Sequence, residues 1–306
     1  MMPSSKAMRL AVVGFGKVGR NCVEAASLSH DLVVAAVVRR TLIGGGGLPE
    51  PHRHIPVATN LGQAKDVEAA MICVPTNVAA DAAAQILHQG IPIVDCITLH
   101  GEAFQFHKDA MHKLAVRSKV PAIVGAGWDP GALSLFRGWL ALLTPGGTTE
   151  TSYRPGVSLH HTAMARSVKG VKDALCAEVR AADGRLRRYV YVELEQGAKP
   201  DLVTEAIYAD PLFLREDTQV FVVDNLAALE EEGRGVVLDR RGVPGPLGHQ
   251  HFVLEARCDE TVLTARVMLA AARALPDLEP GAYALSDIPL CTLWGEQADK
   301  AERDWV

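Results

Sequence analysis

Three glycines near the N-terminus have the spacing of a phosphate-binding turn. They stand in the run Gly14-Phe-Gly-Lys-Val-Gly19, directly after the mostly apolar residues 9–13. In such a turn the first glycine allows a sharp bend, the second lets a pyrophosphate approach the backbone, and the third lets the next helix pack closely. The unpaired N–H groups of that helix then attract the phosphates. We therefore expect a dinucleotide site contacted by Gly14, Phe15, Gly16, Lys17, Val18 and Gly19.

Two arginines indicate which dinucleotide this site would bind. A second apolar stretch, residues 32–38, runs into Arg39-Arg40. About 20 residues past the last glycine, an NAD site usually carries an acid that binds the ribose 2′-hydroxyl. Here no acid is present, and two guanidinium groups suit a 2′-phosphate, although a solvated arginine pair would read the same way. The sequence thus favours NADP over NAD.

Alternating strands and helices would position these residues. We expect strands at 9–13, 32–38, 55–58, 69–74, 91–95 and 121–125, and helices at 21–29, 78–89 and 101–119. Such alternation requires right-handed crossovers and predicts a doubly wound parallel sheet, the Rossmann architecture. Residues at the ends of two later strands complete the expected cofactor site: Val74, Pro75, Thr76 and Asp95.

Beyond Gly147 the pattern changes to alternation with period two. Residues 188–195 and 251–257 show it, and it is typical of an open, mostly antiparallel sheet with one solvated face. Helices are expected at 200–209, 225–232 and 261–275. The chain therefore reads as α/β followed by α+β. Its expected domains are 1–127 and 128–275, with 276–306 as a candidate to pack back on the first.

Composition excludes several classes of partner. The 306 residues carry a net charge of -5 without any Lys/Arg-rich block, so nucleic acid and anionic membranes are not expected partners. The apolar runs are too short to span a bilayer, and the N-terminus lacks the apolar core of a signal peptide. No C-x-x-C pair occurs among the six cysteines. His160-His161 and His249-x-His251 have no acid or cysteine beside them at ligand spacing, so we expect no metal and a cytoplasmic protein.

A resemblance to a known family becomes specific at Val124-Gly-Ala-Gly-Trp-Asp-Pro-Gly131. Together with the glycine turn, Arg39-Arg40, Val94-Asp95 and His100-Gly101, this segment resembles the meso-diaminopimelate dehydrogenases. The similarity continues through residues 154–162, 170–175, 189–195, 241–243 and 263–268, and so covers nearly the whole chain. The resemblance implies an NADP-binding Rossmann domain and a second domain that binds substrate and forms a homodimer. It also implies oxidation of an amino acid at a D-configured carbon, with release of ammonia.

The resemblance assigns the reacting centre to Asp129 and Trp128. A carboxylate near the substrate nitrogen can orient the amine and shuttle its protons. Asp129 also stands as the expected N-cap of a helix at 130–143, with Pro130 in its first turn, and both roles are compatible. Tyr153 matches an aromatic residue over the substrate, and Arg188 matches the arginine that holds the distal carboxylate. The alternatives are a core tyrosine and an arginine on a solvated strand face.

Several positions depart from the family pattern. Thr98 stands where a second acid near the amine is expected, and Glu178 replaces a threonine near the distal carboxylate. Arg154 and His160 replace glycines, and the family histidine falls at Gly248, with His249 beside it. These changes indicate a substrate pocket that differs from that of diaminopimelate dehydrogenases, while the cofactor half is intact.

Three functions remain open from the sequence. The first is an NADP-dependent oxidoreductase acting on an amino acid or imino acid other than diaminopimelate. The second is diaminopimelate dehydrogenase proper, of lysine and cell-wall precursor metabolism, with His160 and His249 replacing the lost contacts. The third is a non-catalytic NADP-responsive binding protein, which the loss of the acid at Thr98 favours and the presence of Trp128-Asp129 disfavours.

Overall fold

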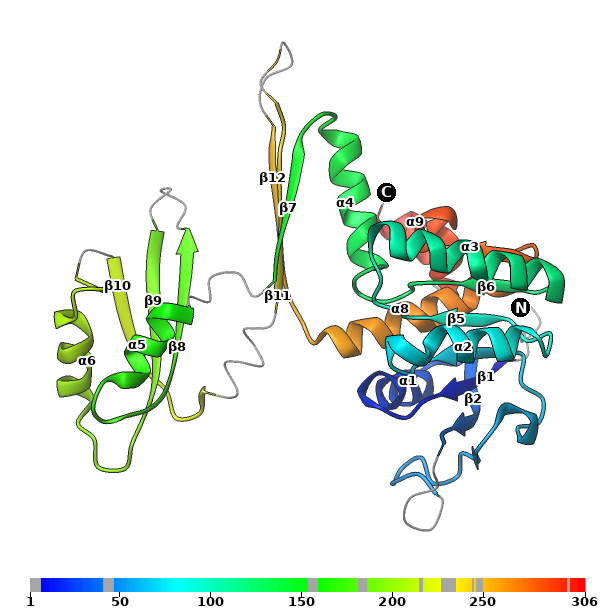
Figure 1. The fold of residues 1–306 in the computed structure, drawn as a ribbon, viewed down its shortest axis with the longest axis horizontal. Helices are drawn as coiled ribbons and strands as arrows, with labels where there is room; N and C mark the ends of the chain where they lie inside the picture. The colour runs from blue at the N-terminus through cyan, green and yellow to red at the C-terminus, as the bar shows by residue number, and fades with distance from the viewer. Residues whose placement is uncertain are drawn as a thin grey trace. The chain divides into compact units, whose positions relative to one another are not determined.

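The structure, a computed structural model, describes residues 7–40, 47–153, 159–180, 186–214, 217–226, 235–243, 245, 250–295 and 298–305. The chain divides into two compact units (Figure 1). The first comprises Met1–Trp139 and Glu260–Val306, and the second comprises Leu140–Asp259.

The first unit contains a seven-stranded parallel sheet. Its strands are β1 (Met8–Val13), β2 (Leu32–Val38), β3 (Val57–Ala58), β4 (Ala69–Ile72), β5 (Ile93–Asp95), β6 (Pro121–Ile123) and β13 (Gly281–Tyr283). The order is β13-β6-β5-β4-β1-β2-β3, and every neighbouring pair is parallel. Strand order reverses between β1 and β4, where ligands of doubly wound sheets bind. The predicted architecture is confirmed.

Helices cover both faces of this sheet. They are α1 (Lys17–Ser27), α2 (Thr76–Leu87), α3 (Gly101–Ser118) and α8 (Glu260–Ala274), with α4 (Ala132–Leu143) and α9 (Ala298–Trp305) also in the chain. Alternate residues of β1 serve the two faces: Leu10 and Val12 pack with α1 and α8, whereas Ala11 and Val13 pack with α2 and α3. A strand buried on both sides must be apolar throughout, which explains why β1 and β2 read as continuous apolar runs.

Helix α8 belongs to the first unit, although it follows the second along the chain. It returns to the blue and cyan strands in Figure 1 and buries Ala265, Met268, Ala271 and Ala272 in the same core as α1. The three alanines let the helix pack closely against its neighbours. The unit boundaries therefore fall after residues 139 and 259, rather than at the expected 127 and 275.

Two helices begin elsewhere than the sequence predicted. Helix α1 begins at Lys17, because Gly16 is its N-cap, and not at Asn21. Helix α4 begins at Ala132 and not at Pro130. Gly131 lies between Pro130 and Ala132 and has a φ of +127°, which is not a right-handed helical conformation. Asp129 is therefore too far from the helix to be its N-cap, and that prediction was wrong.

The second unit holds two three-stranded sheets where the sequence indicated one. The first sheet contains β8 (Val171–Arg180), β9 (Leu186–Leu194) and β10 (Asp217–Val222), and the second contains β7 (Thr148–Tyr153), β11 (Gly235–Arg241) and β12 (His251–Arg257). All pairs are antiparallel except β9 with β10. Helices α5 (Leu159–Ser167) and α6 (Pro200–Ala209) share a core with the first of these sheets. Most of the helix expected at 225–232 lies outside the described residues.

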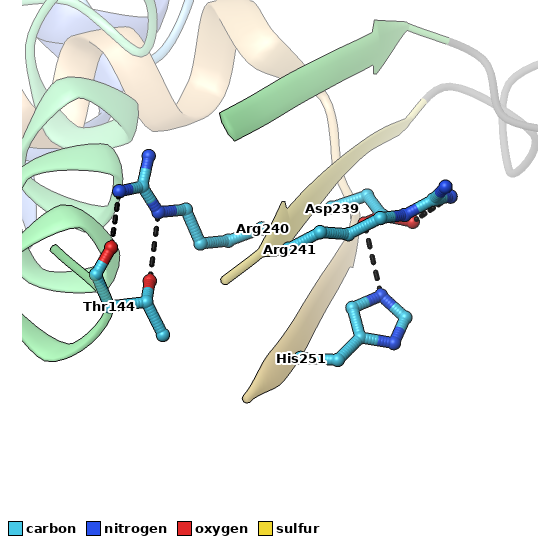
Figure 2. Close-up of polar contacts among 5 residues, drawn as sticks. All are labelled: Thr144, Asp239, Arg240, Arg241 and His251. Atoms are coloured by element: carbon cyan, nitrogen blue, oxygen red, sulfur yellow. Dashed lines mark hydrogen bonds and ion pairs between the residues drawn. The ribbon is translucent and has the colours of Figure 1, made fainter. Parts of the chain in front are cut away.

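A buried arginine fixes the second of these sheets to the residue that follows α4. Arg240 donates from Nε to the Thr144 hydroxyl at 2.8 Å and from Nη2 to the Thr144 carbonyl at 2.5 Å. It also donates to Thr149 Oγ1 at 3.0 Å. Figure 2 shows Arg240 directed to Thr144, whereas Arg241 and His251 both contact Asp239. None of the described helices is both long and apolar enough to cross a membrane.

Candidate functional site

The glycine turn after β1 has the geometry that its spacing predicts. Gly14 has a φ of +100°, and a Cβ there would lie 2.5 Å from the carbonyl oxygen of Cys73. A Cβ on Gly19 would lie 2.1 Å from the Gly14 carbonyl oxygen, so only glycine permits this approach of α1 to the turn. Gly16 instead faces open space, with nothing within 4 Å of its Cβ position. The turn is therefore tight at both ends and open in the middle.

The first turn of α1 is prepared for an anion. No side chain caps the helix at Gly16, and no acidic residue lies in its first turn. The leading N–H groups of a helix have no partners within the helix, and its dipole favours negative charge there. A phosphate beside Gly16 would satisfy these groups.

A cavity of about 740 Å³ opens at this turn. Its volume lies in the range of about 300–1,000 Å³ that is typical of ligand sites. Nine of the twelve expected cofactor residues line it: Gly14, Phe15, Gly16, Lys17, Val18, Arg39, Arg40, Val74 and Pro75. Five more polar residues contribute: Thr59 and Asn60 after β3, Asp81 and Gln85 on α2, and Gln89 just after α2. These were missed from the sequence, although the position of Thr59 at a strand end is a signal that could have been used.

Arg39 and Arg40 give one end of the cavity a positive charge. Both follow β2, and Arg39 also donates from Nη2 to the Gly47 carbonyl oxygen at 3.4 Å. The acid that lines the cavity, Asp81, belongs to α2 and not to the end of β2. The donors present thus suit a phosphate on the ribose, and the residues of the cavity fit NADP.

Asp95 serves the fold and not the cavity. Its carboxylate is fully buried and accepts hydrogen bonds from the backbone N–H groups of Ile97, at 3.1 Å, and Gly125, at 2.8 Å. The buried ring of His107 completes the set, with Nε2 2.8 Å from Oδ2. Asp95 does not line the cavity. Its expected contact with the cofactor is corrected accordingly: the carboxylate joins the ends of β5 and β6.

Two threonines connect the ends of β4 and β5. The hydroxyls of Thr76 and Thr98 lie 2.9 Å apart. Thr76 begins α2 directly after Pro75, which lines the cavity, but Thr76 itself does not line it. Thr98 is exposed, so its hydroxyl can also meet a bound molecule.

Trp128 and Asp129 lie beyond β6 at the same edge of the sheet. The Trp128 backbone N–H donates to Thr264 Oγ1 on α8 at 3.1 Å, and the indole is 7% exposed. Its Nε1 has no hydrogen-bond partner among the described residues. A buried indole N–H without a partner is rare, and a bound acceptor would satisfy it.

Asp129 makes an ion pair that the sequence did not reveal. Both of its oxygens accept from the Arg137 guanidinium, Oδ1 at 2.6 Å and Oδ2 at 2.8 Å. Arg137 lies on α4, and the Asp129 side chain is only 6% exposed. His100 lies on the other side, with Nδ1 4.0 Å from Oδ1. The sequence contained one signal, a lone arginine within the otherwise apolar helix α4.

Cys73 and Cys96 are protonated thiols at neutral pH, and not thiolate nucleophiles. Burial, with the negative charge of Asp95, raises the pKa of Cys96 to about 12. The hydrogen bond with Cys22, followed by burial, raises the pKa of Cys73 as well. Cys73 and Cys96 line the cavity, where they contribute a polarizable wall. Within the described ranges, no three His, Cys, Asp or Glu side chains lie together as metal ligands.

The expected substrate residues lie in the second unit. Arg188 is 4% exposed, on the face of β9 that shares its core with α5 and α6, and not on a solvated face. The register of β8 and β9 pairs it directly with Glu178. Tyr153 ends β7 opposite Val236, and His160 belongs to the first turn of α5. Arg154, Gly248 and His249 lie outside the described residues.

Comparisons with known proteins agree on one group of relatives. The chain is 34% identical over 288 residues to the meso-diaminopimelate D-dehydrogenase of Bacteroides fragilis, which covers 94% of this chain and 95% of that one. No protein-family model matches the chain.

Two solved structures show the same fold. One is a diaminopimelate dehydrogenase of Corynebacterium glutamicum in complex with diaminopimelate, with a TM-score of 0.63 and 21% identity over 98% of this chain and 99% of that one. The other is an engineered D-amino acid dehydrogenase bound to NADP⁺, with a TM-score of 0.63 and 20% identity over 98% and 100%.

Proposed function

The chain belongs to the meso-diaminopimelate dehydrogenase family, and we propose from this that it transfers a hydride between NADP(H) and the α-carbon of an amino acid. The observation that carries the proposal is the cavity in which the glycine turn meets Arg39 and Arg40. The sheet's switch point, the open Gly16 and the paired arginines all favour a dinucleotide with a 2′-phosphate. When bound, the nicotinamide supplies the hydride acceptor for oxidation or the donor for reduction.

Different residues of the first unit would bind different parts of NADP. The first turn of α1 and the glycine turn would bind the pyrophosphate. Arg39 and Arg40 would bind the 2′-phosphate, each with a planar fork of donors. Val74 and Pro75 would line the path beyond. Thr76 and Asp95 act behind this surface, because neither lines the cavity.

Trp128 and Asp129 are the groups that we assign to the substrate. The Asp129 carboxylate is ready to bind an ammonium group, since Arg137 already fixes its direction. Trp128 Nε1 offers a buried donor for a substrate carboxylate. An ion at a desolvated site must meet an opposite charge or a hydrogen-bond partner. For an amino acid, Asp129 would supply the opposite charge to the ammonium and Trp128 would supply a hydrogen-bond donor to the carboxylate.

Charge in the second unit favours a substrate other than diaminopimelate. Arg188 is the cation that we assign to a distal carboxylate, together with Tyr153, Arg154, His160 and His249 as further contacts. The register pairs Arg188 with Glu178, so the positive charge has an acid as its direct neighbour on the adjacent strand. A substrate with a cationic or neutral far end fits this arrangement better than one with a second carboxylate.

Diaminopimelate dehydrogenase proper is the second candidate. The observation in its favour is the 34% identity to the Bacteroides fragilis enzyme over 94% of the chain. If this candidate holds, the chain serves lysine and cell-wall precursor metabolism. A non-catalytic NADP-binding protein is disfavoured, because Asp129 is held in a specific geometry beside the sheet edge.

We further propose a homodimer in the cytoplasm. Helix α4 exposes Phe136, Trp139, Leu142 and Leu143, which are 40–68% accessible in the single chain. Exposed apolar side chains that recur along one helix mark an interaction surface, and a second copy of the chain is the partner that the family resemblance implies. Cys22, Cys73, Cys96 and Cys291 carry unbridged thiols, which fits a reducing compartment.

Turnover with a substrate panel tests the proposed function. NADPH consumption would be followed with 2-oxo acids plus ammonia, and NADP⁺ reduction with D- and L-amino acids, including meso-diaminopimelate. The proposal expects turnover with at least one 2-oxo acid that depends on ammonia, and little with meso-diaminopimelate. Ordinary rates with meso-diaminopimelate would instead establish the second candidate. Tight NADPH binding without turnover on any substrate would support the non-catalytic protein.

A further inference from the structure

Oxidation of an amine requires a base that takes a proton from the substrate. An amino acid arrives as an ammonium ion, and the α-carbon cannot release a hydride until the nitrogen has a free electron pair. The base must therefore lie beside the group that binds the ammonium, which is Asp129 in the proposed function. The described groups near Asp129 that could take this proton are Asp129 itself, Thr98, Cys96, Asp95 and His100.

Asp129 itself is poorly placed to act as the base. Both of its oxygens accept short bonds from Arg137, at 2.6 and 2.8 Å. A proton on either oxygen would displace one of these two charge-assisted hydrogen bonds inside a nearly buried site. Asp129 is thus suited to bind and orient the ammonium, because that role needs a permanent negative charge.

The other polar groups at this edge are not available as bases. Thr98 is a hydroxyl, hydrogen bonded to Thr76. Cys96 has a pKa raised to about 12 by burial and by the charge of Asp95, so its thiol holds its proton at neutral pH. Asp95 is committed to Ile97, Gly125 and His107 and is fully buried.

His100 remains, and its position suits a base. Its Nδ1 lies 4.0 Å from Asp129 Oδ1, and its side chain is 57% exposed. It stands at the N-cap of α3 without making a side-chain capping hydrogen bond, so the ring is not used to cap the helix. Histidine is the side chain whose ordinary charge change falls between about pH 5 and 8.

Several charged groups among the described residues lie near His100. Asp129 faces it from the loop before α4, and Arg137 of α4 lies behind that carboxylate. Glu102 is the acid in the first turn of its own helix. In the lining of the small pocket beside His100, the polar side chains from α4 and from the segment after β13 are Ser134 and Ser286, and neither is an ionisable group.

We propose that His100 is the base that deprotonates the substrate amine, while Asp129, held by Arg137, binds and orients it. This inference rests on the proposed function. In the step, one N–H bond of the substrate ammonium breaks and its proton bonds to the Nε2 electron pair of the neutral imidazole. The products are a neutral amine and an imidazolium, and the nearby Asp129 carboxylate stabilises the new positive charge. His100 later releases this proton to solvent.

The direct test is the pH dependence of amino acid oxidation in His100→Gln. A general base typically contributes a factor of about 10²–10⁴. We expect kcat near neutral pH to fall about 100-fold or more, with the loss shrinking as pH rises and the free amine becomes available in solution. KM for the amino acid and Kd for NADPH should change less than about threefold, because Asp129 and the cofactor cavity are untouched. Added imidazole should restore part of the rate in His100→Ala.

A second measurement does not depend on turnover. The ring protons of His100, followed by NMR in the NADP-bound protein over a range of pH, give the midpoint of its protonation. In Arg137→Gln the midpoint should move to higher pH, since the positive charge of Arg137 beside Asp129 is then lost and the carboxylate lies 4.0 Å from the ring. Arg273→Gln is the matched control, because Arg273 makes a similar two-pronged ion pair with Asp31 elsewhere in the first unit. It should leave both the midpoint and the pH profile of kcat unchanged.

The outcomes separate the inference from the function on which it rests. Active wild-type protein whose pH profile and rate survive His100→Gln would overturn the role of His100 and leave the dehydrogenase in place. A protonation midpoint of His100 that is the same in Arg137→Gln would also contradict the inference, because His100 would then have no electrostatic interaction with Asp129. Wild-type protein that binds NADPH without oxidising any amino acid would overturn the proposed function itself.

Discussion

Single residues decide which cofactor this chain prefers. Arg39 and Arg40 stand where an NAD site would carry an acid, and both line the cavity at the glycine turn. Their planar guanidinium groups can bind a phosphate through two donors each, whereas a 2′-hydroxyl offers them much less. Arg39 also contacts the Gly47 carbonyl, which helps to keep it at the cavity wall.

Changing both arginines should therefore remove the preference for NADP. The native protein should bind NADPH at least about tenfold more tightly than NADH, roughly 1.4 kcal/mol. In the Arg39→Ala/Arg40→Ala double variant, NADPH affinity should fall toward that of NADH, which should itself hardly change. Fluorescence titration with the two reduced cofactors measures both. Equal affinities in the native protein would refute the role of the arginines.

Two further residues determine the expected substrate choice. Thr98 offers only a hydroxyl at the sheet edge, and Glu178 is the register partner of Arg188. A like charge or a missing partner at a desolvated site costs a few kcal/mol, enough to slow turnover about 100-fold or more.

The paired change Thr98→Asp and Glu178→Thr should raise oxidation of meso-diaminopimelate. It adds an acid for the amine and removes one near the distal carboxylate. Initial rates at saturating NADP⁺ measure the effect, with Glu178→Gln alone as a charge-only control. Should the native protein already oxidise meso-diaminopimelate at an ordinary rate, our interpretation of both positions is wrong.

At the scale of elements, the local sequence pattern predicted most of the strands and helices of the first unit. Strand β2 has the predicted bounds, and the helices and strands around it differ by a few residues, because continuous apolar runs and glycines mark them clearly. The expected N-cap at Asp129 was wrong because Gly131, with a φ of +127°, delays the start of α4 to Ala132. The role of Asp95 was equally hidden, since its partners are backbone groups of two separate strand ends.

The second unit was harder to predict for a related reason. Alternation with period two shows that residues lie on opposite faces of a strand, but it does not show which strands pair. Two three-stranded sheets therefore looked like one. A solvated strand face was the alternative to a substrate contact for Arg188, yet Arg188 shares its face with the buried Val190 and Val192.

The hydrogen bonds of Arg240 connect β11 to Thr144 and Thr149, and their contribution to stability can be tested. Arg240→Gln removes hydrogen bonds to Thr144 and Thr149 at a buried site and should destabilise the protein by about 2 kcal/mol. Arg241→Gln, its neighbour in sequence, removes a contact with Asp239 at the surface and should cost much less (Figure 2). Urea unfolding of the two variants gives the comparison. Equal losses would show that burial of Arg240 contributes nothing.

At the scale of the whole molecule, the apolar residues of α4 predict self-association. Sedimentation at micromolar concentration should give a dimer. Trp139→Ser combined with Leu142→Glu should shift it toward monomer, since these side chains are 54% and 68% exposed in the single chain. Ala141→Glu on the same exposed helix is a control for added charge alone. A native protein that sediments only as monomer would refute the dimer.

Transfer of the α-hydrogen itself tests the central claim most directly. The protein would be incubated with NADP⁺ and the best amino acid of the substrate panel, deuterated at the α-carbon, and the NADPH formed would be analysed by mass spectrometry. The account predicts that each NADPH carries one deuterium from the amino acid and that ammonia is released in equal amount. NADPH without deuterium, or no NADPH with any amino acid offered, would contradict it.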